Sequence, residues 1–394
     1  MSTLVTCKLC GESCHSVQLH LSKSHPGVSL GKYQEQFPGA PIFSEAALAR
    51  LAEKTAAEAV QPPVAQVVTL HHAATNLAYV APAAPRTTKR ALYETFDLAQ
   101  SDKTVNLRGG EIQVTVHQGN PHVAYIPDVD PDHVWDVEDL KTELMAIEMG
   151  WPLLVFGHKG TGKTSDIDQI AARCRRPVVR VQHTANLEEA HVVGQWTVAD
   201  GNTVFQLGFL AQAMLDGMIY LADEYDIAQP GVCTAYQSVM EGKPLVIKDA
   251  PPHLRIIKPA PGFTFVATGN TNGTGDPTGL YPGTTVQNSA NYDRFVIKLR
   301  KDYMAANLEA DAVVRQTKIA RVEAEKLVKI AGEIRKMYSA GKLSDTISTR
   351  AMVNIARVGI MRARMRLGFQ LCYANGLNEV DYKAVDGVAQ RVYG

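Results

Sequence analysis

The sequence lacks long hydrophobic runs and any surplus of charge. No apolar stretch approaches the ~20 residues needed to span a bilayer, and the first residues are polar, without the charged-then-apolar pattern of a secretory signal. We therefore expect a cytoplasmic protein with no membrane-spanning segment. Lysine plus arginine equal aspartate plus glutamate at 40 each, so the chain as a whole has no field that would attract nucleic acid or an anionic membrane.

Cysteine is scarce, and its placement argues against a framework of disulfide bonds. Three of the six cysteines lie within residues 7–14, and the others are scattered, which is typical of a metal site. The spacing predicts a two-cysteine, two-histidine Zn²⁺ site with the ligands Cys7, Cys10, His20 and His25. Because so small a unit has almost no apolar core, zinc would supply much of its folding free energy. The alternative is that these side chains hold no metal.

This N-terminal stretch resembles the zinc finger of the Ros/MucR family, and the resemblance extends to residues 27–38 with Tyr33 and Phe37. Fingers are often assumed to read DNA. However, residues 1–40 contain only three lysines, and no arginine precedes Arg50, whereas guanine and phosphate contacts need more cations. We expect the finger to dock onto a protein at least as readily as onto DNA.

Changes in composition divide the chain into five regions. Residues 60–90 are rich in proline, alanine, valine and threonine without a period, as linkers are, and residues 112–116 alternate as a strand does. Beyond residue 302 helical periods dominate, with the longest patterns at 308–338 and 350–373. The predicted regions are a zinc finger (1–40), a helix and Pro/Ala-rich linker (41–90), a small β-rich region (91–131), an α/β core (132–301) and a helical lid (302–394).

A glycine-rich segment behind an apolar strand is typical of a phosphate-binding loop. Residues 157–164 read G-x-x-x-x-G-K-T and follow the apolar run 153–156. In such a loop, backbone amides and the start of a helix face the phosphates of ATP. We expect Lys163 to reach the β and γ phosphates and Thr164 to hold Mg²⁺. The predicted nucleotide-binding residues are Gly157, Gly160, Thr161, Gly162, Lys163, Thr164, Ser165 and Asp223.

Four more apolar runs of strand length follow, separated by helical or loop segments, at 177–181, 218–222, 263–268 and 295–299. This alternation predicts a parallel sheet with crossover helices, the α/β class of P-loop NTPases. Asp223 and Glu224 come directly after the second of these runs, at the carboxyl end of a strand and beside the phosphate loop. We expect Asp223 to order the waters of Mg²⁺ and Glu224 to act as general base on the attacking water.

Three polar residues are predicted to complete the catalytic set begun by Glu224. Asn270 follows the next strand, where its side chain can reach the γ phosphate or the attacking water. Arg294 opens the fifth strand and is predicted to act on a neighbouring subunit's nucleotide as an arginine finger; the alternative is a surface salt bridge. Arg350 starts a lid helix and offers a second cation; the alternative is a solvated arginine on a capped helix.

These elements in this order resemble the AAA+ ATPases of the MoxR branch, and within it the ATPase subunits of cobaltochelatase. The resemblance covers residues 123–394, and its most specific stretches are 126–132, 223–226 and 269–281. It implies an AAA+ core with a helical lid and a ring, usually of six subunits, with ATP sites at the interfaces. It also implies a partner protein with a von Willebrand-type metal-binding domain.

Two further segments, 196–205 and 245–264, are predicted as hairpins that interrupt the core. In rings of the MoxR branch such hairpins face the pore or the partner; the alternative is a plain surface ribbon. The family does not begin with this finger and linker, so the cargo of the chain is left open.

The leading hypothesis is a ring-forming ATP hydrolase that remodels a protein partner. The alternative is a DNA-directed motor that grips nucleic acid with the finger and the lid, because residues 301–370 contain 14 lysines or arginines against 7 aspartates or glutamates. A third hypothesis, a module that uses ATP only to assemble, is disfavoured by the intact Asp223-Glu224 pair.

Overall fold

The computed structural model describes residues 4–28, 30–44, 46, 85–101, 104–106, 109–276, 279–281, 283–284 and 286–394. The chain divides into two compact units, one up to Ala73 and one from Ala74 onward. Most of the predicted helix and linker at 41–90 lies outside the described residues, as do two positions of the stretch 269–281. The five regions predicted from composition therefore stay a prediction.

The first unit is small and has few buried apolar side chains. Its strands β1 (Val5–Thr6) and β2 (Ser13–Cys14) pair in antiparallel fashion, and two helices follow, α1 (Val17–Ser24) and α2 (Leu30–Gln36). The buried core in its described part consists of Val5, Cys7, Val17, Leu21 and Tyr33. A core of this size gives little hydrophobic stabilisation, so the unit needs a further source of folding free energy.

A parallel sheet forms the centre of the second unit, with the strand order β13-β5-β12-β9-β6. Every neighbouring pair is parallel, which confirms the predicted α/β class. The last strand begins at Ile297, slightly later than predicted, because Phe295 closes the preceding turn and is buried in the core. The strands are β5 (Leu153–Phe156), β6 (Val178–Gln182), β9 (Ile219–Asp223), β12 (Thr264–Gly269) and β13 (Ile297–Arg300).

Alternate side chains of these strands enter two different cores. Leu153 and Val155 of β5 pack in the same core as helices α5 (Val137–Met149) and α6 (Lys163–Cys174). Leu154, between them, belongs to the other core, which is built by α7 (Glu189–Val193), α8 (Phe209–Asp216) and α9 (Pro230–Met240). Since strand side chains alternate with a period of two, burial on both faces explains why these strands are apolar throughout.

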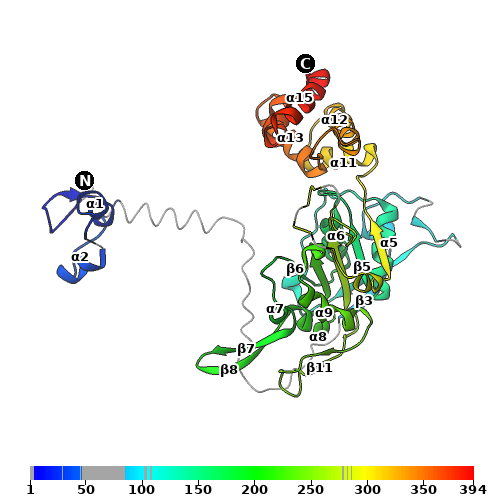
Figure 1. Cartoon of the computed structure of the whole chain (residues 1–394), viewed down its shortest axis with the longest axis horizontal. Coiled ribbons are helices and arrows are strands. Elements are labelled where there is room, and N and C mark those ends of the chain that lie inside the picture. Colours follow the sequence, from blue (N-terminus) through cyan, green and yellow to red (C-terminus); the bar gives the residue numbers. More distant parts are fainter. Residues whose placement is uncertain are drawn as a thin grey trace. The chain divides into compact units, whose positions relative to one another are not determined.

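Three antiparallel ribbons accompany the sheet, and two of them are the predicted hairpins. Strands β7 (Gly194–Ala199) and β8 (Asn202–Leu207) project from the body of the unit (Figure 1). The second hairpin is shorter than predicted and pairs only β10 (Leu245–Val246) with β11 (Ile256–Ile257). The third ribbon pairs β3 (Arg86–Ala91) with β4 (Gln113–Gln118), nearer the N-terminus.

The C-terminal residues 302–394, which are described throughout, form a helical bundle (Figure 1, yellow to red). Its core includes Leu327, Ile334, Ile355 and Phe369. The patterns predicted at 308–338 and 350–373 are each broken into two helices rather than one. The helices are α11 (Ala306–Thr317), α12 (Arg321–Ser339), α13 (Thr349–Met361), α14 (Met365–Cys372) and α15 (Glu379–Tyr393).

Left-handed residues cause both breaks. Lys318 has φ 59° and Ala363 has φ 51°, a conformation that ends a right-handed helix. Apolar residues keep their helical spacing on either side, so the hydrophobic pattern alone does not reveal the break.

A buried lysine holds the sheet to the helices on one face. Lys301 directly follows β13 and is 1% exposed. Its ammonium forms ion pairs with Asp166 of α6, with Glu143 Oε1 at 3.3 Å and with Asp139 Oδ2 at 3.5 Å. Burial raises the pKa of Glu143, although Lys301 acts in the opposite direction. Lys301 is thus the cation shared by three carboxyl groups on two helices.

Replacing this cation tests how much the fold depends on it. Lys301→Met should lower the free energy of unfolding by about 3–5 kcal/mol, because Asp166 would remain buried without its partner. Urea denaturation monitored by circular dichroism measures the change. Lys318→Met is the matched control, since it removes an exposed ion pair with Asp132 and should change stability little. Equal stability of the two variants would contradict the role given to Lys301.

Candidate active site

The glycine-rich loop lies between the end of β5 at Phe156 and the start of α6 at Lys163, as predicted. Two of its glycines are in close contact with other segments. A Cβ atom on Gly157 would lie 2.1 Å from the carbonyl oxygen of Lys301, and one on Gly160 would lie 2.4 Å from the Cβ of Ser348. Only glycine fits at these positions, because a side chain would collide with the segments that pack on the loop.

The side chain of Lys163 turns into this loop. Its ammonium donates hydrogen bonds to the carbonyl oxygens of Gly157 at 2.8 Å and His158 at 3.0 Å, and to Asn270 Oδ1 at 3.1 Å. Burial lowers the pKa of Lys163 to about 8, although nearby carboxylates, above all that of Asp226, act in the opposite direction. An ammonium held by neutral carbonyls and an amide is well suited to exchange these partners for phosphate oxygens.

Thr161 and Ser165 serve the loop itself through their hydroxyl groups. Thr161 donates to the carbonyl oxygen of His158 and Ser165 to that of Gly162, both at 3.0 Å. The two side chains therefore stabilise the turn that Gly162 makes into α6.

Thr164 and Asp223 meet as predicted for a Mg²⁺ site. Thr164 donates from its hydroxyl to Asp223 Oδ1 at 3.0 Å, Thr268 donates to the same oxygen, and Arg180 Nε donates to Asp223 Oδ2 at 3.0 Å. Burial would raise the pKa of Asp223, but the hydrogen bonds from Thr268 and Arg180 outweigh it, so the pKa lies below its ordinary value. A hydroxyl beside an ionised carboxylate is a donor set that Mg²⁺ accepts.

Glu224 directly follows β9 and has an unusual backbone conformation. Its φ is 55°, in the left-handed region, which costs a residue with a side chain about 1–3 kcal/mol. Its carboxylate accepts a hydrogen bond from Gln182 Nε2 at 3.3 Å. Strain of this kind persists only where the surroundings enforce it, and it concentrates at functional sites.

Asn270 lies just past β12, where a buried aspartate holds it. Asp226 Oδ2 accepts hydrogen bonds from the backbone N–H of Asn270 and of Thr271, both at 2.9 Å, and from the Thr271 hydroxyl at 3.1 Å. The side-chain amide of Asn270 also accepts a hydrogen bond from Lys163. By holding the backbone of Asn270, Asp226 therefore positions this amide beside the phosphate loop.

The lid contacts the phosphate loop directly. Lys159 forms an ion pair with Asp345, with Nζ 2.7 Å from Oδ2, and Tyr303 donates from its hydroxyl to the carbonyl oxygen of Lys159 at 3.2 Å. Ser348, which packs on Gly160, is the N-cap of α13. Arg350 lies in the first turn of that helix, close enough for its charge to help lower the pKa of Lys163.

Arg294 is separated from this group. It precedes β13, at the edge where the parallel strands begin, whereas the phosphate loop follows β5 at the edge where they end. Its Nε donates to Glu241 Oε1 at 2.8 Å, so within one subunit the arginine forms the salt bridge named above as the alternative. The structure thus brings together Lys163, Thr164, Asp223, Glu224, Asn270 and Arg350, and leaves Arg294 apart.

Several residues that support this group were not predicted from the sequence. Arg180 pairs with Asp223, and its signal was a charge within an apolar strand. Asp226 belongs to the stretch 223–226, whose last carboxylate had no predicted role. Gln182 carries no signal, because its partner Glu224 follows a different strand, β9.

In the first unit, the four predicted zinc ligands gather at one point. The sulfur and nitrogen atoms of Cys7, Cys10, His20 and His25 all lie within 4.8 Å of one another. Cys10 Sγ is 3.1 Å from His20 Nε2, and His25 Nε2 is buried without a hydrogen-bond partner among the described residues. Two thiols and two imidazoles at this separation fit the tetrahedral geometry of Zn²⁺.

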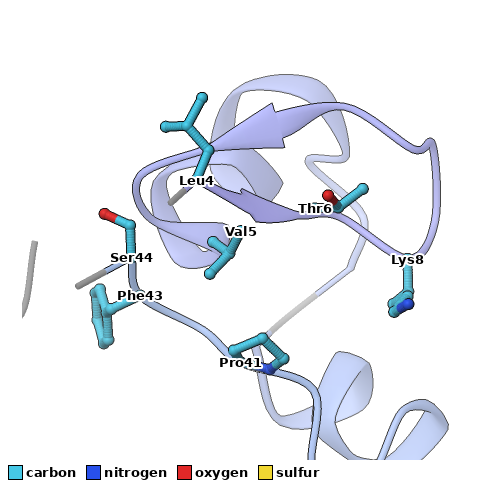
Figure 2. A pocket seen from close by; sticks show the side chains of 7 residues that line it. All are labelled: Leu4, Val5, Thr6, Lys8, Pro41, Phe43 and Ser44. Carbon is cyan, nitrogen blue, oxygen red and sulfur yellow. The ribbon is translucent and has the colours of Figure 1, made fainter. Parts of the chain in front are cut away.

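A cavity of about 400 Å³ lies beside β1 of the first unit (Figure 2). Its lining is mostly apolar and carries a single cationic side chain. The lining residues are Leu4, Val5, Thr6, Lys8, Pro41, Phe43 and Ser44.

Comparison with known proteins agrees with the geometry of the second unit. Residues 152–295 match the family model of the AAA domain (dynein-related subfamily), and residues 309–366 match that of the CbbQ/NirQ/NorQ C-terminal region. The chain is 32% identical to the aerobic cobaltochelatase subunit CobS of Sinorhizobium sp. over 306 residues, which cover 74% of this chain and 91% of CobS. The chain belongs to the AAA+ ATPases of the MoxR branch. ATP and Mg²⁺ are therefore implied as substrate and cofactor of this ATPase.

Other relatives match about half of this chain. Protein NorQ of Paracoccus denitrificans is 29% identical over 205 residues, which cover 52% of this chain and 72% of NorQ. The denitrification regulatory protein NirQ of Pseudomonas aeruginosa is 27% identical over 220 residues, which cover 55% of this chain and 80% of NirQ. A solved structure of a putative ATPase from Cytophaga hutchinsonii has a TM-score of 0.37 and 17% identity, covering 68% of this chain and 92% of its own. Among the described helices of this ATPase, none has the length and apolar character to cross a membrane.

Proposed function

We propose that this ATPase assembles into a ring of six subunits in the cytoplasm and couples ATP hydrolysis to the remodelling of a protein partner. The observation that supports a ring is the position of Arg294. It lies at the opposite edge of the sheet from the phosphate loop of its own subunit, so it can stabilise transition-state charge only in a neighbouring subunit.

In this proposal each group of the site has a defined role. Lys163 binds the β and γ phosphates, and Thr164 and Asp223 hold Mg²⁺, which neutralises charge on the phosphates. Glu224 takes the proton of the attacking water, and Asn270 orients that water or the γ phosphate. Arg350, on a lid helix, supplies a second cation to the phosphates of the nucleotide.

The proposed partner is a protein, as the resemblance to cobaltochelatase ATPase subunits implies, with a von Willebrand-type domain as the candidate. CobS is named as one subunit of its enzyme, which supports a role beside other chains. The DNA-directed alternative is not favoured: the names of CobS, NorQ and NirQ do not refer to DNA, and the finger region has only three lysines.

We further propose that the finger binds Zn²⁺ and docks the ring onto its partner. The apolar lining of the cavity beside β1 supports a protein ligand, because apolar side chains fit such a surface and phosphate groups do not.

The proposed general base is tested by Glu224→Gln. This variant should bind ATP normally but hydrolyse it at least ~10²-fold more slowly, since glutamine cannot accept the proton. Steady-state phosphate release and fluorescent-nucleotide titration measure the two quantities. Glu379→Gln, at an exposed position of α15, is the control and should behave as wild type. Normal turnover by Glu224→Gln would overturn the assignment.

The proposed role of Arg294 in a neighbouring site is tested by mixing subunits. Arg294→Ala and Lys163→Ala should each lose at least ~10³-fold in turnover, whereas their mixture should recover activity, because each supplies what the other lacks at shared interfaces. Glu241→Gln breaks the same salt bridge but keeps the arginine, so it should remain active. Loss of activity in Glu241→Gln, or no recovery on mixing, would favour a structural salt bridge instead.

The proposed metal site is tested by zinc content. The purified full chain should contain about one zinc per chain, and Cys10→Ser should contain almost none, because a tetrahedral site rarely survives loss of a thiolate. Mass spectrometry of acid-released metal measures both. Cys372→Ser, in the lid, should keep its zinc. A wild-type protein free of zinc after purification without chelators would contradict the proposal.

A further inference from the structure

A buried histidine lies directly behind the predicted catalytic carboxylates. His183 follows β6 and is 1% exposed. Both its backbone N–H, at 2.8 Å, and its ring Nδ1, at 3.0 Å, contact the carbonyl oxygen of Asp223. A carbonyl oxygen can only accept, so Nδ1 must carry a proton. The partner of Nε2 is the neutral hydroxyl of Tyr236, and a buried ring with neutral partners on both nitrogens stays uncharged, which leaves Nε2 as an acceptor.

Two buried tyrosines continue the hydrogen-bond chain. The Tyr236 hydroxyl lies 2.9 Å from His183 Nε2, and the Tyr220 hydroxyl lies 2.9 Å from that of Tyr236. Because Nε2 accepts, Tyr236 donates to it, and Tyr220 must donate to Tyr236. All three donors therefore point the same way, toward the Asp223 carbonyl. Hydrogen bonds aligned in this manner strengthen one another in a buried site.

This chain of hydrogen bonds ends on the peptide group that joins Asp223 to Glu224. His183 binds the carbonyl of this peptide twice, and the N–H of Glu224 donates to Thr268 Oγ1 at 3.4 Å. Rotation of a peptide plane changes ψ of the residue before it and φ of the residue after it. On the other side of the Glu224 Cα, the N–H of Ile227 donates to the Glu224 carbonyl oxygen at 2.9 Å. With the peptide planes on both sides held, φ of Glu224 is fixed at its strained value of 55°.

We propose that His183 is a positioning residue for ATP hydrolysis. By holding the Asp223–Glu224 peptide, it keeps Glu224 in the left-handed conformation that sets the direction of its carboxylate. Tyr236 and Tyr220 fix the tautomer and the orientation of the imidazole. The inference rests on the proposed role of Glu224 as general base.

Variants of His183 test the proposal in the full-length ATPase. His183→Phe keeps a ring but removes the side-chain donor, and kcat should fall about 10- to 100-fold, since a misplacement of about 1 Å can cost ~10² in rate. The Kd for a fluorescent ATP analogue should stay within about twofold, because the phosphate loop is untouched. His183→Asn places an amide N–H where Nδ1 was and should restore most of kcat. A wild-type kcat in His183→Phe would overturn the proposal.

A milder pair of variants covers the case in which His183→Phe does not fold, as judged by thermal melting. Tyr236→Phe removes one hydroxyl from the chain and should lower kcat by about 2- to 5-fold. Tyr292→Phe is the matched control, because its buried hydroxyl has no hydrogen-bond partner among the described residues. Equal kcat values for these two variants would also overturn the proposal.

A double variant separates positioning from general destabilisation. If His183 acts through Glu224, adding His183→Phe to Glu224→Gln should not lower the residual rate further, whereas independent effects would multiply. A further fall of tenfold or more would contradict the inference. Normal hydrolysis by Glu224→Gln alone would instead refute the proposed function, and an inactive Glu224→Gln beside a fully active His183→Phe would refute this inference only.

Discussion

The constraint on which the site depends is the common direction of the strands. In a parallel sheet all carboxyl ends lie at one edge, and five chain segments leave the sheet there: Gly157 after β5, His183 after β6, Glu224 after β9, Asn270 after β12 and Lys301 after β13. Residues more than a hundred positions apart thereby come within hydrogen-bond distance, as Lys163 and Asn270 do. Arg294 lies at the opposite edge, so the topology places the proposed arginine finger out of reach of the phosphate loop of its own subunit.

Buried polar contacts hold in place the segments that leave the sheet at this edge. Asp226 holds the backbone beyond β12 by three hydrogen bonds, His183 holds that beyond β9, and Lys301 anchors the first turn of α6 through Asp166. Each of these groups is costly to bury and is stabilised only by the partners it orders. The site is therefore supported by a second layer of side chains behind the phosphate loop and the predicted catalytic residues.

The fold class and most of the nucleotide site could be predicted from sequence because both depend on local signals. The glycines and Lys163 follow one strand within a few residues, and Asp223-Glu224 follow another. Contacts across strands were not predictable: nothing near Gln182 or His183 indicates that Glu224 and Asp223 lie beside them. The breaks at Lys318 and Ala363 were missed for another reason, since neither residue type favours positive φ. Arg294 was assigned a role by its place in the chain, while its partner Glu241 could be found only in three dimensions.

The ion pair between Lys159 and Asp345 makes the phosphate loop a shared component of core and lid. Because the loop contacts the lid, nucleotide binding and the loop–lid contact are linked. A nucleotide that competes for Lys159 would weaken its ion pair with Asp345 of the lid. Linkage is reciprocal. A change in the lid that strengthens the Lys159–Asp345 pair would therefore weaken nucleotide binding by the same factor.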